Sequence, residues 1–161
     1  MQLIEEWGFA FYIADAEDPY KADAGGVFTR SQVFVDAFRA RAPDLPAALS
    51  TYGAAPTPYV LPIDFAAWRR GGFDLLPQAY VNESELYRPD LTIAHAIRAG
   101  WEAGKVHPVV GVYRQYPAEA YLPLLKAARS YGFSVYLADQ MSDADYVALG
   151  RGIDAGLAAP R

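Results

Sequence analysis

Cysteine is absent from this chain of 161 residues, and histidine occurs only twice. The absence of cysteine excludes disulfides, thiol catalysis and cysteine-based zinc sites. His95 and His107 lie too far apart in sequence to form a local metal-binding motif, so we expect no metal site.

The glycine-rich motif of nucleotide-binding proteins and the nucleophile motif of serine hydrolases are also missing. Gly25-Gly26 and Gly71-Gly72 lack the spaced glycines that cradle a phosphate between a strand and a helix. Gly-x-Ser-x-Gly does not occur, which argues against a serine hydrolase. We therefore expect no cofactor.

Basic residues and long apolar runs are scarce. The chain has 14 Lys and Arg against 19 Asp and Glu, a net charge of −5, which disfavours a nucleic-acid partner. No apolar run reaches the roughly 20 residues of a membrane span, so we expect no membrane partner. No basic region precedes an apolar run at the N-terminus, so no signal peptide is visible. Two locations stay open as expectations, the cytoplasm and a virion.

What is present is a regular alternation of predicted strands and helices. Apolar runs predict strands at 9–14, 47–52, 73–81, 107–113 and 133–139. Apolar residues at helical spacing predict helices that follow each strand. Thr29 or Ser31 is expected to cap the first of these, which runs to about Arg41 with Val33, Phe34, Ala37 and Phe38 inward. The others are expected at 63–70, 90–103 (stopped by Gly104), 118–130 and 143–157.

This alternation predicts an α/β fold of parallel (β/α) repeats, in one domain over 1–161. Polar side chains follow every predicted strand, the arrangement with which a (β/α)8 barrel builds its site. A full barrel takes about 250 residues, so the chain would hold five C-terminal units of a TIM-barrel-like domain. An open doubly wound sheet is the alternative. Pro77 is expected near the end of its strand or at a bulge, because a central strand needs its N–H groups.

The first predicted strand ends in two acids, Asp15 and Glu17. Because they are two residues apart, their side chains point to the same side of an extended backbone. Two neighbouring carboxylates at the end of a buried strand raise the pKa of one of them, which suits a proton donor. We therefore regard Glu17 as the candidate general acid and Asp15 as the stabilising carboxylate. A solvated loop is the structural alternative.

Polar and aromatic residues at the ends of later strands complete the candidate site. Gln78 is an amide in an apolar strand and needs a partner, which is either a ligand or a neighbouring main chain. Asp139 is a candidate ligand contact or a partner of Arg114. Tyrosines can floor a sugar groove or serve as core residues with the hydroxyl at the rim. The candidates are Tyr12, Tyr52, Tyr113, Tyr116 and Tyr136, whereas Tyr80 is expected to contact the sugar through its hydroxyl.

Two short motifs resemble the strand ends of chitinase- and lysozyme-like (β/α)8 glycoside hydrolases: Asp15-Ala-Glu17 and Gln78-Ala-Tyr80. Three further stretches extend the similarity: Ala48-Leu-Ser-Thr-Tyr52-Gly, Val109-Val-Gly-Val-Tyr113 and Gly132-Phe-Ser-Val-Tyr136-Leu. The chain is similar over nearly its whole length to glycosidase-like barrel domains of actinobacteria and their tailed phages. This resemblance implies that the acidic pair lies on the fourth barrel strand. In substrate-assisted members the acid pair would act with a tyrosine such as Tyr80 on an N-acetyl sugar. The fuller chitinase signature has further acids where this chain has Phe11 and Ile13.

Two functions follow as expectations. The first is a glycoside hydrolase-like domain acting on an N-acetyl-sugar polysaccharide such as peptidoglycan or chitin, in which Tyr52, Gln78, Tyr80, Tyr113 and Asp139 contact the sugar. The second is a non-catalytic carbohydrate-binding or structural module of a phage tail or cell-surface assembly. Five parallel units leave open strand edges, so we also expect self-association or a preceding segment that completes the barrel.

Overall fold

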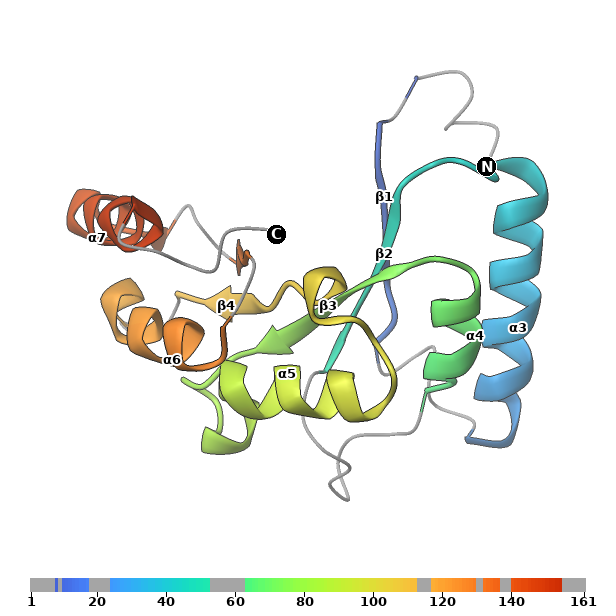
Figure 1. Ribbon diagram of the computed structural model, residues 1–161, viewed down its shortest axis with the longest axis horizontal. Helices are drawn as coiled ribbons and strands as arrows, with labels where there is room; N and C mark the ends of the chain where they lie inside the picture. Colours follow the sequence, from blue (N-terminus) through green and yellow to red (C-terminus); the bar gives the residue numbers. More distant parts are fainter. Residues whose placement is uncertain are drawn as a thin grey trace. The chain divides into compact units, whose positions relative to one another are not determined.

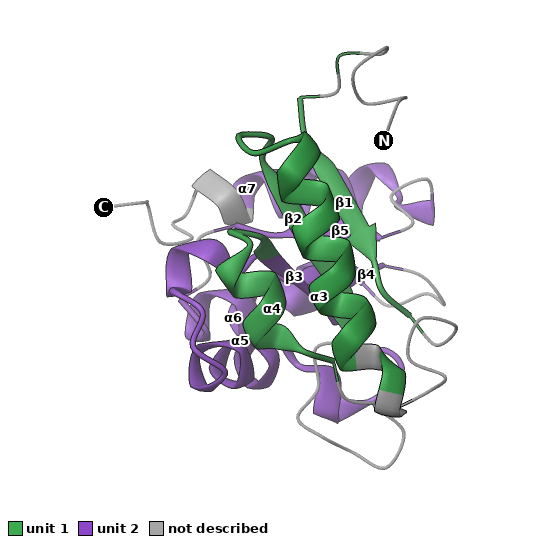
Figure 2. Ribbon diagram, turned by 90° about the vertical axis from the view of Figure 1, so that its right-hand side faces the viewer, with its two compact units in different colours: residues 1–51, 56–74 green, residues 52–55, 75–161 purple. Residues whose placement is uncertain are grey.

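The computed structural model describes residues 8, 10–17, 24–52, 63–112, 117–129, 132–136 and 140–154. The chain divides into two compact units, coloured separately in Figure 2: unit 1 is 1–51 with 56–74, and unit 2 is 52–55 with 75–161. No helix in the described ranges is both long enough and apolar enough to cross a membrane.

Strands and helices alternate along the chain, as Figure 1 shows. The strands are β1 (Tyr12–Asp15), β2 (Ala47–Tyr52), β3 (Asp74–Ala79), β4 (Val109–Gly111) and β5 (Ser134–Tyr136). The α-helices are α3 (Ala24–Arg41), α4 (Phe65–Arg70), α5 (Pro89–Arg98), α6 (Tyr121–Ala127) and α7 (Asp143–Asp154). Short 3-10 helices are η1 (Glu85–Tyr87), η2 (Ala103–Lys105) and η3 (Ala118–Ala120). The predicted α/β fold of parallel (β/α) repeats is confirmed.

In unit 1, β1 and β2 pair in parallel, with Ile13 opposite Ala48 and Asp15 opposite Ser50. An aromatic cluster connects this pair to α3 and α4: ring contacts at 4.9–6.3 Å join the side chains of Tyr12, Phe34, Phe38, Trp68 and Phe73. Tyr12 thus belongs to the apolar layer under α3. Stacked and edge-on aromatic pairs contribute beyond the area they bury, so this cluster is the main core of unit 1.

The predicted start and apolar stripe of α3 are wrong in part. The helix begins at Ala24, so neither Thr29 nor Ser31 caps it. Ser31 is fully buried and accepts a hydrogen bond from the indole N–H of Trp68 at 3.2 Å. Phe38 is buried as predicted, but Val33 is 62% exposed. A polar residue that reads as a cap is used instead to satisfy the buried indole.

In unit 2, β3, β4 and β5 pair in parallel in chain order. Neither unit contains a reversal of strand order among its described strands, which a doubly wound sheet needs at its switch point. One core cluster packs Val81 and Val110 against Tyr121 and Leu125 of α6. The α6 side of the unit 2 sheet is therefore buried, and β3 is buried on its other face as well, at Gln78.

Pro77 lies inside β3 rather than at its end. Leu75 is bridged to Val106 and Gln78 is paired with Val109, so the register is the same on both sides of the proline and no bulge occurs. Of the two predicted positions the bulge is wrong, and Pro77 lies two residues before the last residue of β3. The sheet tolerates the proline because pairing resumes at once on its far side.

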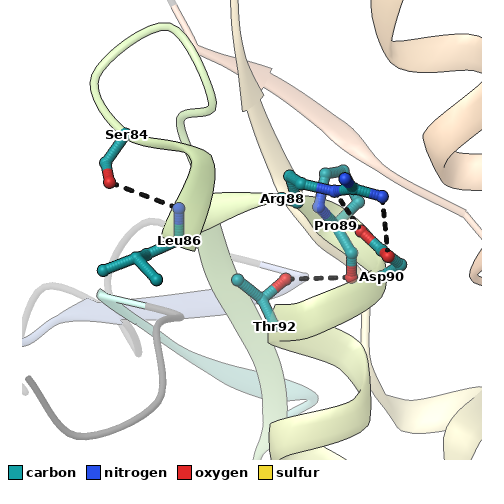
Figure 3. Close-up of polar contacts among 6 residues, drawn as sticks. All are labelled: Ser84, Leu86, Arg88, Pro89, Asp90 and Thr92. Atoms are coloured by element: carbon teal, nitrogen blue, oxygen red, sulfur yellow. Dashed lines mark hydrogen bonds and ion pairs between the residues drawn. The ribbon is translucent and has the colours of Figure 1, made fainter.

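The start of α5 is fixed by local polar contacts, shown in Figure 3. The guanidinium of Arg88 forms two 3.0 Å contacts with the carboxylate of Asp90, and the hydroxyl of Thr92 donates to the carbonyl of Pro89 at 3.1 Å. Ser84 accepts from the N–H of Leu86 at 3.2 Å and so caps η1. Only the contact from Ser84 satisfies a main-chain N–H at a helix start, that of η1, whereas α5 has no side-chain cap and begins with Pro89, which has no N–H.

The end of α5 corrects the predicted range. The helix stops at Arg98, because Gly100 has a φ of 96° and the N–H of Trp101 donates to the carbonyl of Ala96 at 3.1 Å. This left-handed glycine cap ends the helix earlier than Gly104 would. It also turns Trp101 inward, where it is 3% exposed.

Candidate functional site

The carboxyl end of the unit 2 sheet carries a stacked pair of tyrosines. The rings of Tyr80 and Tyr136 have centroids 5.4 Å apart and planes inclined by 24°. Tyr80 is 8% exposed, whereas Tyr136 is 46% exposed. The pair therefore presents Tyr136 to solvent with Tyr80 behind it, and we call it the tyrosine platform.

The strand register explains how these two rings meet. Ala79 lies opposite Val110, and Gly111 lies opposite Tyr136, so Tyr80 follows β3 at the level of Gly111. Val110 and Val135 face the α6 side, and because side chains alternate along a strand, Gly111 and Tyr136 face the other side. Gly111, which is in register with Tyr136, has no side chain to stand between the two rings at this level of β4.

Tyr121 supports the same place from the α6 side. Its hydroxyl is buried, donates to the carbonyl of Gly111 at 2.9 Å and accepts from the N–H of Gly111 at 3.3 Å. The hydroxyl also lies 3.2 Å from Oδ1 of Asn82, in the turn after β3. One phenol on α6 thus connects the turn after β3 with the carboxyl end of β4, the strand over which the two rings meet.

Gln78 occupies the row below the platform. It lies opposite Val109, which in turn lies opposite Ser134. Gln78 is 3% exposed, and its Oε1 atom accepts no hydrogen bond from the described residues, although the residue takes part in another interaction. Gln78 and Tyr80 are two residues apart and share one face of the extended chain. The predicted neighbours therefore lie together in unit 2.

Tyr52 forms a second aromatic pair in unit 2. Its ring stacks on that of Tyr87 in η1, with centroids 6.3 Å apart and planes inclined by 22°. Tyr87 is not among the predicted residues, because η1 lies in a stretch with the composition of a polar loop. The predicted contribution of Tyr52 to an aromatic surface stays a prediction.

The acid pair belongs to unit 1. Asp15 ends β1 and is exposed, Ala16 is 3% exposed, and Glu17 is partly buried. The N–H of Ala16 donates to the carbonyl of Ser50 at 2.9 Å, and the buried hydroxyl of Thr51 donates to the carbonyl of Ala16 at 2.9 Å. These bonds extend the pairing past the last residue of β1, so the segment that carries both acids is held against β2.

Tyr113, Tyr116 and Asp139, predicted to contact ligand or to line a groove, lie outside the described residues. Unit 2 brings together Tyr80, Gln78 and Tyr136. Of these three, Tyr136 was predicted only as one of several groove tyrosines, and its role depends on a register that sequence does not give.

A cavity of about 350 Å³ lies elsewhere in unit 1, lined in part by Arg39, Asp44 and Arg70. The guanidinium of Arg39 donates to the carbonyls of Gly71, Leu45 and Ala42. It also lies 5.1 Å from the ring centroid of Phe38 and 4.8 Å from that of Phe73. Burial lowers the pKa of Arg39, and the charge of Asp44 opposes this shift. With its donors directed at main-chain oxygens, Arg39 has a structural role there.

Among the described residues, no cluster of His, Asp and Glu has the geometry to hold a metal ion. Comparisons with models of protein families, with curated proteins and with solved structures gave no match to this chain.

Proposed function

We propose that this chain is a carbohydrate-binding (β/α)-repeat domain, in which a glycan stacks on the exposed ring of Tyr136. The observation that carries the proposal is the tyrosine platform, a half-exposed phenol ring backed by Tyr80 at 5.4 Å. An aromatic face carries partial negative charge and packs against the C–H groups of a pyranose ring. Because Tyr80 holds the ring in place, little side-chain freedom is lost on binding.

Nucleic-acid bases also stack on tyrosines, but a strand of nucleic acid needs basic residues along its backbone. The net charge of −5 makes this class of ligand the weaker choice. An N-acetyl-sugar polysaccharide, such as chitin or peptidoglycan, is the ligand class that the resemblance to glycosidase-like barrels suggests.

Hydrolysis of a glycan by unit 1 is the second candidate function. The observation that favours it is the position of Asp15 and Glu17 at the end of β1, two residues apart on a segment held by Thr51. In this proposal Glu17 protonates the glycosidic oxygen and Asp15 stabilises the positive charge that develops on the sugar.

Binding is tested with chitin and peptidoglycan sacculi in sedimentation assays, with cellulose as the polymer that lacks the N-acetyl group. We expect Tyr136→Ala to weaken binding about 10-fold, equivalent to about 1.4 kcal/mol. Tyr146→Ala, which removes another tyrosine with 53% exposure, is the matched control and should bind normally. Equal binding by the two variants would refute the platform as the glycan site.

Hydrolysis is tested by the release of reducing ends from the polymer that binds. Glu17→Gln should reduce the rate at least ~100-fold, the size expected for loss of a general acid. Glu119→Gln, at an exposed acid in η3, is the control. If the unmodified chain binds the polymer but releases no reducing ends, hydrolysis is refuted and the domain is a binding module.

A further inference from the structure

The cavity of unit 1 is bounded by the loop between α3 and β2 and by the loop after α4. Its volume of about 350 Å³ is at the lower end of the range for small-molecule sites, so a ligand here is small. Three side chains of its lining are charged, two of them basic and one acidic: Arg39, Arg70 and Asp44. The rest of the lining is uncharged: Pro43, Leu45, Pro46, Gly71 and Gly72.

The guanidinium of Arg39 keeps one donor for a ligand in addition to its structural role. Its Nε and Nη1 atoms donate to the main-chain carbonyls of Gly71 and Leu45. Its Nη2 atom has a single long contact, 3.4 Å to the carbonyl of Gly72. Since Nη2 carries two N–H groups, one of them has no acceptor among the described residues. Gly72, with a φ of 72°, leaves this nitrogen accessible, because a Cβ there would lie 3.9 Å from it.

A hydrogen-bonded chain on the surface orients the second guanidinium. Nη2 of Arg70 donates to Oε1 of Gln32 at 2.7 Å, and Nε2 of Gln32 donates to Oδ1 of Asp36 at 2.8 Å. The Nε and Nη1 atoms of Arg70 donate to no group in the described part of the chain. Arg70 is therefore held in place with donors to spare, and it loses little side-chain freedom when it binds an anion.

Asp44 supplies the opposite charge. Burial lowers the pKa of Arg39, and the charge of Asp44 opposes this shift only in part. The positive charge of Arg39 is thus incompletely compensated, and an anion in the cavity would compensate it further. The carboxylate of Asp44 is exposed and accepts no hydrogen bond from the residues that the structure describes, so it can accept one from a cationic group.

We propose that this cavity binds an acidic α-amino acid, with its two carboxylates on Arg39 and Arg70 and its ammonium group on Asp44. The charges match, because the lining has one more positive than negative group and the ligand has one more negative than positive. Contacts between guanidinium and carboxylate are charge-assisted hydrogen bonds. Phosphate is the weaker choice, because Asp44 would repel it. The site lies within unit 1 and does not depend on glycan binding.

Binding is measured by NMR titration of the main-chain amides with L-glutamate, at low ionic strength because salt screens exposed charges. We expect saturable shifts centred on Gly71 and Gly72, with a Kd in the millimolar range, since exposed ion pairs are weak. Arg70→Gln should weaken the affinity about 5-fold, the upper size for an exposed ion pair. Arg41→Gln, at an exposed arginine of α3 outside the cavity, is the control and should bind normally. A thermal melt of each variant shows that it is folded.

Glutarate, which lacks the ammonium group, isolates the role of Asp44. Asp44→Asn should weaken the binding of glutamate about 5-fold but should not weaken that of glutarate. Inorganic phosphate tests for an unselective anion site. Equal affinities for phosphate and glutamate would overturn the proposal, as would unchanged glutamate binding in Asp44→Asn. Shifts that do not saturate by about 50 mM glutamate, well above a millimolar Kd, would overturn it as well.

Discussion

Tyr80 and Tyr136 stack at 5.4 Å although a strand lies between those from which they extend. The contact crosses β4 at Gly111, the residue in register with Tyr136. The candidate glycan site of unit 2 therefore depends on a residue that contributes no side chain.

Gly111→Val should separate the two rings, because a β-branched side chain would occupy the space between them. We expect a cost of about 1–3 kcal/mol in unfolding free energy, as for other overpacked sites, and weaker glycan binding. Urea denaturation and near-UV circular dichroism of the tyrosines measure the two effects. Gly104→Val is the control, since a Cβ at Gly104 meets no atom within 4 Å. Unchanged tyrosine dichroism in Gly111→Val would contradict this account.

Tyr121→Phe removes the hydroxyl that both donates to and accepts from Gly111. The buried main-chain groups lose that partner, so the unfolding free energy should fall by about 1–3 kcal/mol. Tyr146→Phe, at an exposed tyrosine, should change it by less than about 0.5 kcal/mol. Equal stability of the two variants in urea would show that the Tyr121 hydroxyl contributes nothing.

Arg39→Lys keeps the positive charge but loses the planar guanidinium that reaches Gly71, Leu45 and Ala42. An ammonium group cannot serve these carbonyls in the same geometry, so we expect a loss of about 1–3 kcal/mol. Thermal unfolding compares this variant with Arg41→Lys, at an exposed arginine on the same helix. A melting temperature equal to that of Arg41→Lys would remove the structural role assigned to Arg39.

The stability of the chain should fall on acidification in part because of His95. Burial, followed by the charge of Arg98, lowers the pKa of His95 from its usual value of 6.5. The unfolded chain therefore takes up this proton at a higher pH than the folded chain does. Stability is lost as the pH falls below about 6.5, until the folded form is protonated as well. His95→Gln should show a smaller loss between pH 7 and pH 5 in urea titrations, and parallel curves for the two proteins would exclude His95 as a source.

Much of the fold follows from the sequence because strands and helices have distinct apolar periods. The five predicted strands all overlap strands of the structure, and the end of α3 at Arg41 agrees. The start of α3 was missed because Ser31 looks like a cap, and its burial against Trp68 is a tertiary contact. The early end of α5 was missed as well, since Gly100 rather than Gly104 adopts the left-handed conformation that ends the helix.

Less of the candidate site than of the fold could be predicted from the sequence. The proximity of Gln78 and Tyr80 follows from their spacing alone. The stacking of Tyr136 on Tyr80 and the support from Tyr121 depend on strand register and on helix packing, which have no local signature. Tyr87 was missed for the same reason, because its partner Tyr52 lies 35 positions earlier in the chain.

Pro77 gives the β3–β4 ladder a gap in its middle rather than at an end. A proline carries no amide hydrogen, so β3 has one fewer donor between Leu75 and Gln78, where pairing is otherwise continuous in register. Local opening of these strands can therefore start from within the ladder, and the amide of Val109, which points to β3, should exchange with solvent deuterium sooner than that of Val110, which points to β5 as the main-chain groups of Pro108 and Val112 do.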